Sequence, residues 1–143
     1  MKRREAFHLA VPLGVTVTPE MFYAAFPEPH ASTFVLDGGG AIARPRLDRA
    51  SFMGASPAAT FRARRTTARD DAGRLLADVV VQHADGSTVA RKDVDAFAAL
   101  RELLSLEAIP ATVFDPRYPF PFRGGLVGYL GYECGQMLER LPC

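Results

Sequence analysis

The stretch PFPFRGGLVGYLGYE, residues 119–133, guides the interpretation of the whole chain. Four glycines are interspersed here with apolar and aromatic residues. Glycine inside a strand costs about 0.5–1 kcal/mol relative to alanine, so a strand with several glycines needs a reason, such as a neighbouring backbone packed flush against it. The pattern predicts a β-strand from Leu126 to Tyr132 with a bare face pressed against another part of the protein, launched by a turn at residues 124–125.

The same stretch resembles the PF-x-GG-x-x-GY-x-GYE signature in the N-terminal region of component I of the chorismate-utilising synthases. That family includes anthranilate synthase and aminodeoxychorismate synthase. A second similarity lies upstream, where FVLDG at residues 34–38 and DRASFMGASP at residues 48–57 resemble F-x-L-E/D-S followed by GR-Y/F-SF-L/M-G-x-x-P. The two similarities bracket most of the chain and together point to this family.

The resemblance implies the N-terminal part of the anthranilate synthase component I-like α+β fold, with a pocket for tryptophan or a similar amino acid between its sheets. The positions that match this pocket are Leu36, Asp37, Gly38, Arg49, Ala50 and Ser51. Gly38 replaces a serine of the family, and Ala50 replaces an aromatic residue. Because a lost hydrogen bond costs about 0.5–1.5 kcal/mol, we expect the pocket to be empty, altered or devoted to packing.

The resemblance also implies that the Mg²⁺-dependent chemistry belongs to a later chorismate-binding region, which supplies the acid–base groups and metal ligands. We therefore expect no catalytic residue, metal ligand or cofactor in this chain and no activity when it is alone. The expected partners are that catalytic region, in the same or a separate chain, and a glutamine amidotransferase that supplies ammonia.

Details of the motifs favour one branch of the family. The acid at position 37, SFMG rather than SFLG, and GYE rather than GYD favour aminodeoxychorismate synthase, a transaminase-type transferase that acts toward 4-aminobenzoate and folate. The alternative is anthranilate synthase, a lyase of tryptophan biosynthesis. An alternative from another class is a free-standing, non-catalytic ligand-binding or scaffold domain of the same fold. A third is an unrelated β-rich binding module.

Composition is that of a soluble globular protein. The chain has 143 residues, of which 48% are hydrophobic and 23% charged, and this predicts a single domain over residues 1–143. The net charge of +1 gives no electrostatic case for nucleic acid or an anionic membrane surface, and no apolar run reaches the ~18–20 residues that span a bilayer. Cys134 and Cys143 suggest neither a zinc site nor a disulfide framework, so the expected setting is reducing and cytoplasmic.

Residue patterning predicts an α+β fold with a mostly antiparallel sheet and a few short helices. One helix should follow the hydroxyl cap Thr18, a second should follow the cap Asp93 and run to Leu104, and a third should cover residues 136–141 with Met137 and Leu138 inward. The expected strands are residues 6–17, 32–37, 51–54, 60–67, 75–82 and 87–92, with a hairpin turn at 84–86.

Several polar residues are candidate sites with a simpler structural explanation. Glu133 is more simply a partner of Arg123 or Arg140 than a catalytic acid, and His83 is expected to be exposed beside its turn. The glycines at 38–40 lack the following Lys-Ser/Thr of a phosphate-binding loop. A group of arginines could bind an anion, although a solvated strand face is the simpler interpretation: Arg62, Arg64, Arg65 and Arg69. These residues alone do not identify an enzyme.

Overall fold

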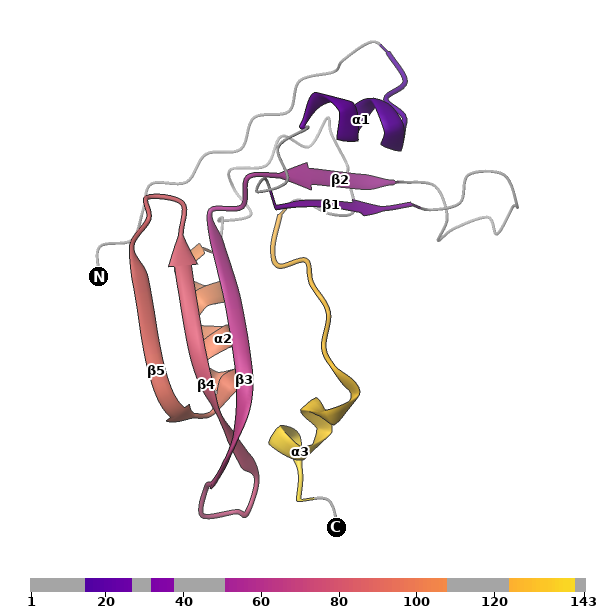
Figure 1. Cartoon of the computed structure of the whole chain (residues 1–143). Helices are drawn as coiled ribbons and strands as arrows, with labels where there is room; N and C mark the ends of the chain where they lie inside the picture. Colours follow the sequence, from indigo (N-terminus) through magenta and orange to yellow (C-terminus); the bar gives the residue numbers. More distant parts are fainter. Residues whose placement is uncertain (1–14, 27–31, 38–50, 108–123, 141–143) are drawn as a thin grey trace. The chain divides into compact units, whose positions relative to one another are not determined.

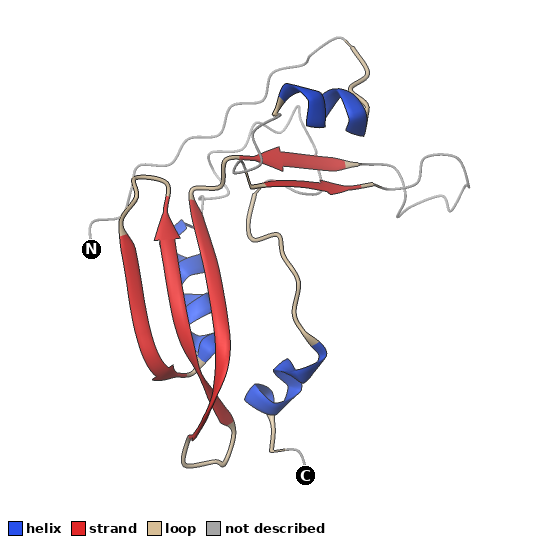
Figure 2. Cartoon of the chain, viewed as in Figure 1, coloured by secondary structure: helices blue, strands red, loops and turns tan. Residues whose placement is uncertain are grey.

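The computed structural model describes residues 15–26, 32–37, 51–107 and 124–140. These residues form a two-stranded sheet, β1–β2, a three-stranded sheet in the order β3-β4-β5, and three short α-helices (Figures 1 and 2). The predicted α+β class is therefore confirmed. The chain divides into two compact units, residues 12–59 and residues 60–143 together with 1–11. Each unit is described by itself, and the single domain over residues 1–143 stays a prediction.

The smaller unit begins with α1, Pro19–Ala25. Thr18 is its N-cap as predicted, since its side chain accepts a hydrogen bond of 3.3 Å from the backbone N–H of Met21. Pro19 occupies the first turn, where its missing N–H costs nothing. The helix ends at Phe26, whose ring centroid lies 5.0 Å from that of Phe22. No α1 side chain is fully buried. The strand predicted over residues 6–17 lies mostly outside the described residues, and residues 15–17 form no strand.

The two-stranded sheet of this unit pairs β1, Thr33–Leu36, with β2, Phe52–Ala55. The strands are antiparallel, and their register sets Phe34 opposite Gly54 and Leu36 opposite Phe52. Both strands were predicted from the sequence, but their pairing was not. The register brings FVLDG and SFMG, which are separated by residues 39–50, onto neighbouring strands.

The larger unit is built on β3, Ala59–Arg69, β4, Leu75–His83, and β5, Thr88–Val94. The turn from β3 to β4 is organised by Asp70. Its Oδ1 accepts hydrogen bonds from the backbone N–H groups of Ala72 (3.0 Å) and Arg74 (2.8 Å), and its Oδ2 accepts one from Nε of Arg74 (2.7 Å). Gly73 has a φ of 78°, a conformation that glycine adopts without steric cost.

The turn from β4 to β5 is the one that the sequence predicted. Gly86 has a φ of 83°, and Oδ1 of Asp85 accepts hydrogen bonds from the backbone N–H of Ser87 (2.9 Å) and from its hydroxyl (2.6 Å). The N–H of His83 donates to the carbonyl of Ser87 at 2.9 Å. These local bonds bring β4 and β5 together as antiparallel neighbours, with Val80 opposite Ala90.

The core of this unit lies on one face of β4. Strand residues alternate between the two faces of a sheet, and the buried ones in β4 are every second residue: Leu75, Ala77, Val79 and His83, with Val81 partly buried. Ala96 of α2 and Met137 of α3 complete the buried cluster. Figure 1 shows α2 lying against the sheet. The opposite face of β4 carries Asp78, Val80 and Gln82 and is more exposed.

Helix α2, Ala96–Glu107, begins later than predicted. Asp95, not Asp93, is the cap, because Oδ1 of Asp95 accepts hydrogen bonds of 2.9 Å from the N–H groups of both Phe97 and Ala98. Asp93 instead belongs to β5, next to an irregularity in the β4–β5 pairing between Ala77 and Val79. Its φ is 48°, and its side chain accepts a hydrogen bond of 2.7 Å from the Thr66 hydroxyl.

The predicted strand from Leu126 to Tyr132 is wrong. Residues 125–131 have no regular secondary structure (Figure 2), and they lead into a 3₁₀ turn, Tyr132–Cys134, and then α3, Gly135–Leu138. Among the described residues, none lies within 4 Å of the position that a Cβ would take at Gly128 or Gly131. The bare face is thus not pressed against the described part of the chain. In α3, Met137 is buried as predicted, whereas Leu138 is exposed.

Asp70 predicts a pH dependence of stability. Its pKa is held below the ordinary value, first by the hydrogen bond from the N–H of Arg74 and also by the Arg74 side chain. A carboxyl with a lowered folded pKa stabilises the fold above its unfolded pKa of about 3.9, and this contribution is lost as the pH falls through the folded pKa. We expect Asp70→Asn to flatten the loss of thermal stability below about pH 4. Arg74→Gln keeps the backbone donor and should give an intermediate slope, whereas an unchanged slope in Asp70→Asn would show that another group causes the acid sensitivity.

The cap of α2 gives a second prediction. Asp95→Ala should lower the free energy of unfolding by about 1 kcal/mol, because two N–H groups of the first turn lose their acceptor. Asp95→Asn is the control, since its amide oxygen can still accept these hydrogen bonds. Urea denaturation of both variants checks this. An equal loss for Asp95→Asn and Asp95→Ala would show that the cap hydrogen bonds do not stabilise the helix.

Candidate functional site

Three of the six residues predicted to bind an amino acid lie at one end of the β1–β2 sheet. Leu36 is the last residue of β1 and is exposed, Asp37 follows it, and Ser51 immediately precedes β2. The other three predicted residues, Gly38, Arg49 and Ala50, lie outside the described residues. The structure therefore brings together three of the six positions. Leu36 and Asp37 come from the first half of the upstream motif, and Ser51 comes from the second half.

A hydrogen bond connects the two halves of this motif. The Ser51 hydroxyl donates to Oδ1 of Asp37 at 2.8 Å. The bond fits the register, since Leu36 pairs with Phe52 and the next residues outward on each strand are Asp37 and Ser51. A carboxylate and a hydroxyl on adjacent strand ends are groups that could bind the ammonium group of an amino acid.

Electrostatics around Asp37 also involve α1. The pKa of Glu20 is lowered, first by its hydrogen bond with Thr18, while the negative charge of Asp37 acts in the opposite direction. Two carboxylates therefore influence each other within this unit.

Gly54 has a packing role in this sheet. A Cβ built at Gly54 would overlap the ring of Phe34 and lie only 2.8 Å from its Cζ. Phe34 therefore lies across the bare backbone of its partner residue, which is an example of an aromatic side chain packing on a cross-strand glycine. The contact joins the FVLD and SFMG segments directly.

Among the described residues Glu133 does not pair with Arg140, and the other predicted partner, Arg123, lies outside the described residues. Its carboxylate lies 3.2 Å from Nη2 of Arg65, while Nη1 of Arg65 donates to Oε1 of Gln136 at 2.8 Å. Arg65 thus connects β3 to the segment that precedes and forms α3. Arg69 instead donates to the carbonyl of Gly73 at 2.7 Å, so these two arginines have separate local roles.

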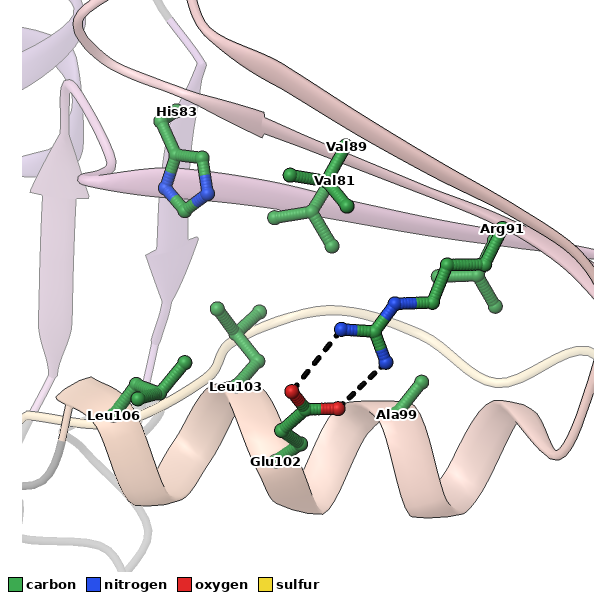
Figure 3. Close-up of a pocket in the computed structure, with 9 residues that line it drawn as sticks. Val81, His83, Val89, Arg91, Ala99, Glu102, Leu103 and Leu106 are labelled. Carbon is green, nitrogen blue, oxygen red and sulfur yellow. Dashed lines mark hydrogen bonds and ion pairs between the residues drawn. The ribbon is translucent and has the colours of Figure 1, made fainter. Parts of the chain in front are cut away.

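The structure contains a second candidate site that the sequence patterns did not indicate. A cavity of about 50 Å³ lies between α2 and the β4–β5 hairpin, and it is walled by aliphatic side chains from the two strands and the helix (Figure 3). Its polar groups are His83 and the pair Arg91–Glu102. The alternation Leu75, Ala77, Val79, Val81 ending at His83 could have indicated that this histidine faces inward.

His83 is buried, not exposed as the sequence suggested. Only 9% of its surface is accessible, and among the described residues no group hydrogen-bonds to its Nδ1. Its backbone N–H and carbonyl are both used in the hairpin turn. A buried polar atom without a partner costs about 1–3 kcal/mol.

The opposite side of the cavity is bordered by an ion pair. Nη1 and Nη2 of Arg91 donate to Oε2 and Oε1 of Glu102 at 2.6 and 3.0 Å, which is a bidentate arrangement (Figure 3). This hydrogen bonding lowers the pKa of Glu102 and raises that of Arg91. Because the two charges compensate each other, this border has no net charge.

Metal-binding clusters and membrane-spanning helices are both absent from the described residues. Within them, no group of three or more His, Cys, Asp or Glu side chains is placed to hold a metal ion. No helix in the described ranges has the length and hydropathy needed to cross a bilayer.

Comparison with known proteins gave no match to a protein family, a curated protein or a solved structure. The resemblance to the chorismate-utilising synthases therefore stays a prediction from the motifs.

The Phe34–Gly54 contact gives a prediction. Gly54→Ala should destabilise the protein by about 1–3 kcal/mol, the usual cost of overpacking, because the new methyl group would displace the Phe34 ring. Gly128→Ala is the matched control, since a Cβ there has nothing within 4 Å among the described residues. Thermal unfolding checks both variants. Equal stability of Gly54→Ala and wild type would contradict the contact.

Proposed function

We propose that this chain is the N-terminal part of a chorismate-utilising synthase of the aminodeoxychorismate branch, acting in chorismate amination toward 4-aminobenzoate and folate. In this proposal the chain has a structural or amino-acid-binding role and is inactive alone. The carrying observation is the β1–β2 pairing, which sets Phe34 against Gly54 and joins Asp37 to Ser51. Residues from the two halves of the upstream motif are thus paired on adjacent strands and joined by a hydrogen bond.

The downstream motif supports the need for a catalytic partner. Residues 126–132 are largely apolar, and the side chains of Leu130, Tyr129 and Tyr132 are mostly or fully exposed. An apolar segment of this kind is typical of a surface that meets another protein region. We propose that the chorismate-binding catalytic region, in the same or a separate chain, packs on this segment and supplies the Mg²⁺ site. A glutamine amidotransferase would supply ammonia.

The test is an assay of the native gene product isolated from its source cells, together with its intact mass. We expect aminodeoxychorismate to form from chorismate in the presence of Mg²⁺ and ammonia, either by a longer chain or by a complex that contains this one. The isolated 143-residue chain should give none. A native product without chorismate turnover and without a chorismate-binding partner would refute the proposal, and formation of anthranilate would assign it to the other branch.

A surface variant makes this test sharper. Tyr129→Asp should leave the stability of the isolated chain unchanged, because the side chain is exposed, yet it should weaken assembly with the catalytic region and lower the chorismate turnover. Thr88→Asp at the start of β5 is also an exposed substitution and serves as the control. Equal turnover in both variants would show that residues 126–132 are not the contact surface.

The second candidate is a non-catalytic domain that binds an amino acid, and the Asp37–Ser51 pair is the observation that favours it. Calorimetric titration of the chain with tryptophan tests this candidate. Binding that is weakened by Ser51→Ala would support it, whereas no heat at millimolar tryptophan would refute it.

A further inference from the structure

The cavity between α2 and the β4–β5 hairpin belongs entirely to the larger unit and contains none of the residues in the proposed amino-acid site. Its walls are apolar on both sides, with Val79, Val81 and Val89 from the strands and Leu103 and Leu106 from the helix. Ala99 contributes only a methyl group to the helix side (Figure 3). The small side chain at this position leaves space between the two layers.

One group in this apolar space is positioned to recognise a ligand. The ring of His83 points from the end of β4 toward α2 (Figure 3). It is more than nine-tenths buried, and Nδ1 has no hydrogen-bond partner among the described residues. Buried polar atoms are almost always satisfied in native proteins, so this nitrogen indicates a missing partner within the cavity.

The charges around the cavity select against an ionic ligand. Arg91 and Glu102 satisfy each other through two hydrogen bonds, so neither offers a free counter-charge. A ligand ion would lose its hydration in an apolar cavity without compensation. A hydroxyl group suits Nδ1 best, because it can donate to or accept from an imidazole nitrogen and so fits either tautomer.

We propose that this cavity binds a small, neutral, apolar molecule with a single hydroxyl group, such as a short-chain alcohol, whose hydroxyl hydrogen-bonds to Nδ1 of His83. The apolar body of the ligand lies between Val81 and Val89 of the hairpin and Leu103 of α2. The cavity volume of about 50 Å³ limits the ligand to a few heavy atoms, because each enclosed water needs roughly 10–15 Å³. The proposal does not depend on the synthase assignment.

The test compares ethanol with ethanethiol, which has the same chain with a thiol, a much weaker hydrogen-bonding group, in place of the hydroxyl. Both are titrated into the full chain, with NMR detection of the valine and leucine methyl groups and of the His83 ring nitrogens. We expect both compounds to shift the methyl signals around the cavity, and ethanol to bind about tenfold more tightly, a difference equivalent to about 1.4 kcal/mol. Ethanol should shift the nitrogen signals of His83 more than ethanethiol does.

Three variants locate the site. His83→Phe should remove the preference for ethanol without lowering thermal stability, because an unsatisfied polar atom is replaced by an apolar ring. Ala99→Leu should fill the cavity and abolish binding of both compounds. Val80→Ala, on the opposite and more exposed face of β4, should leave binding unchanged.

Two results would overturn the proposal. Equal affinities of wild type for ethanol and ethanethiol would show that His83 does not recognise the hydroxyl. Absence of shifts at the cavity methyl groups with either compound would show that the cavity does not admit a ligand. If His83→Phe does not fold, the proposal is still tested by the loss of binding in Ala99→Leu and by the nitrogen shifts of His83 in the wild type.

Discussion

The larger unit depends on the burial of one face of β4. Leu75, Ala77 and Val79 point to the same side and are covered by α2 and α3. Helix α2 has 12 residues and α3 only 4, and isolated helices shorter than about 12–15 residues are marginal in water. Their stability therefore comes from the apolar surface that they bury against this strand. Asp70 and Asp85 accept backbone hydrogen bonds in the turns on either side of β4, and so limit the ways in which the chain can reach this face.

The two candidate sites differ in how they are built. Asp37 and Ser51 meet at the end of an antiparallel pair, so the strand register alone brings them together. The cavity at His83 needs two layers, because its walls come from both the hairpin and α2. Burial of a polar ring in the second site has a stability cost that a purely apolar core would avoid. In the proposed binding mode, the hydrogen bond between the ligand and the His83 ring offsets this cost.

Local patterns in the sequence determined most of the secondary structure. Thr18-Pro19-Glu20 predicted the start of α1, Asp85-Gly86 predicted the β4–β5 turn, and period-two alternation predicted the strands, because these signals depend on residues close in sequence. The partner of a strand is not encoded locally. Residues 126–132 have strand-like alternation, yet the described part of the chain offers them no neighbouring strand, and they remain irregular.

Tertiary structure decided the features that carry chemistry. Asp93 and Asp95 are both good helix caps by composition, and the pairing of β5 with β4 through Val94 delays the helix so that Asp95 becomes the cap. His83 lies beside a turn, where exposure is the simplest expectation. It is buried because α2 covers that end of β4. Only the packing of a helix that begins more than ten residues later determines whether the imidazole is exposed to water or covered by that helix.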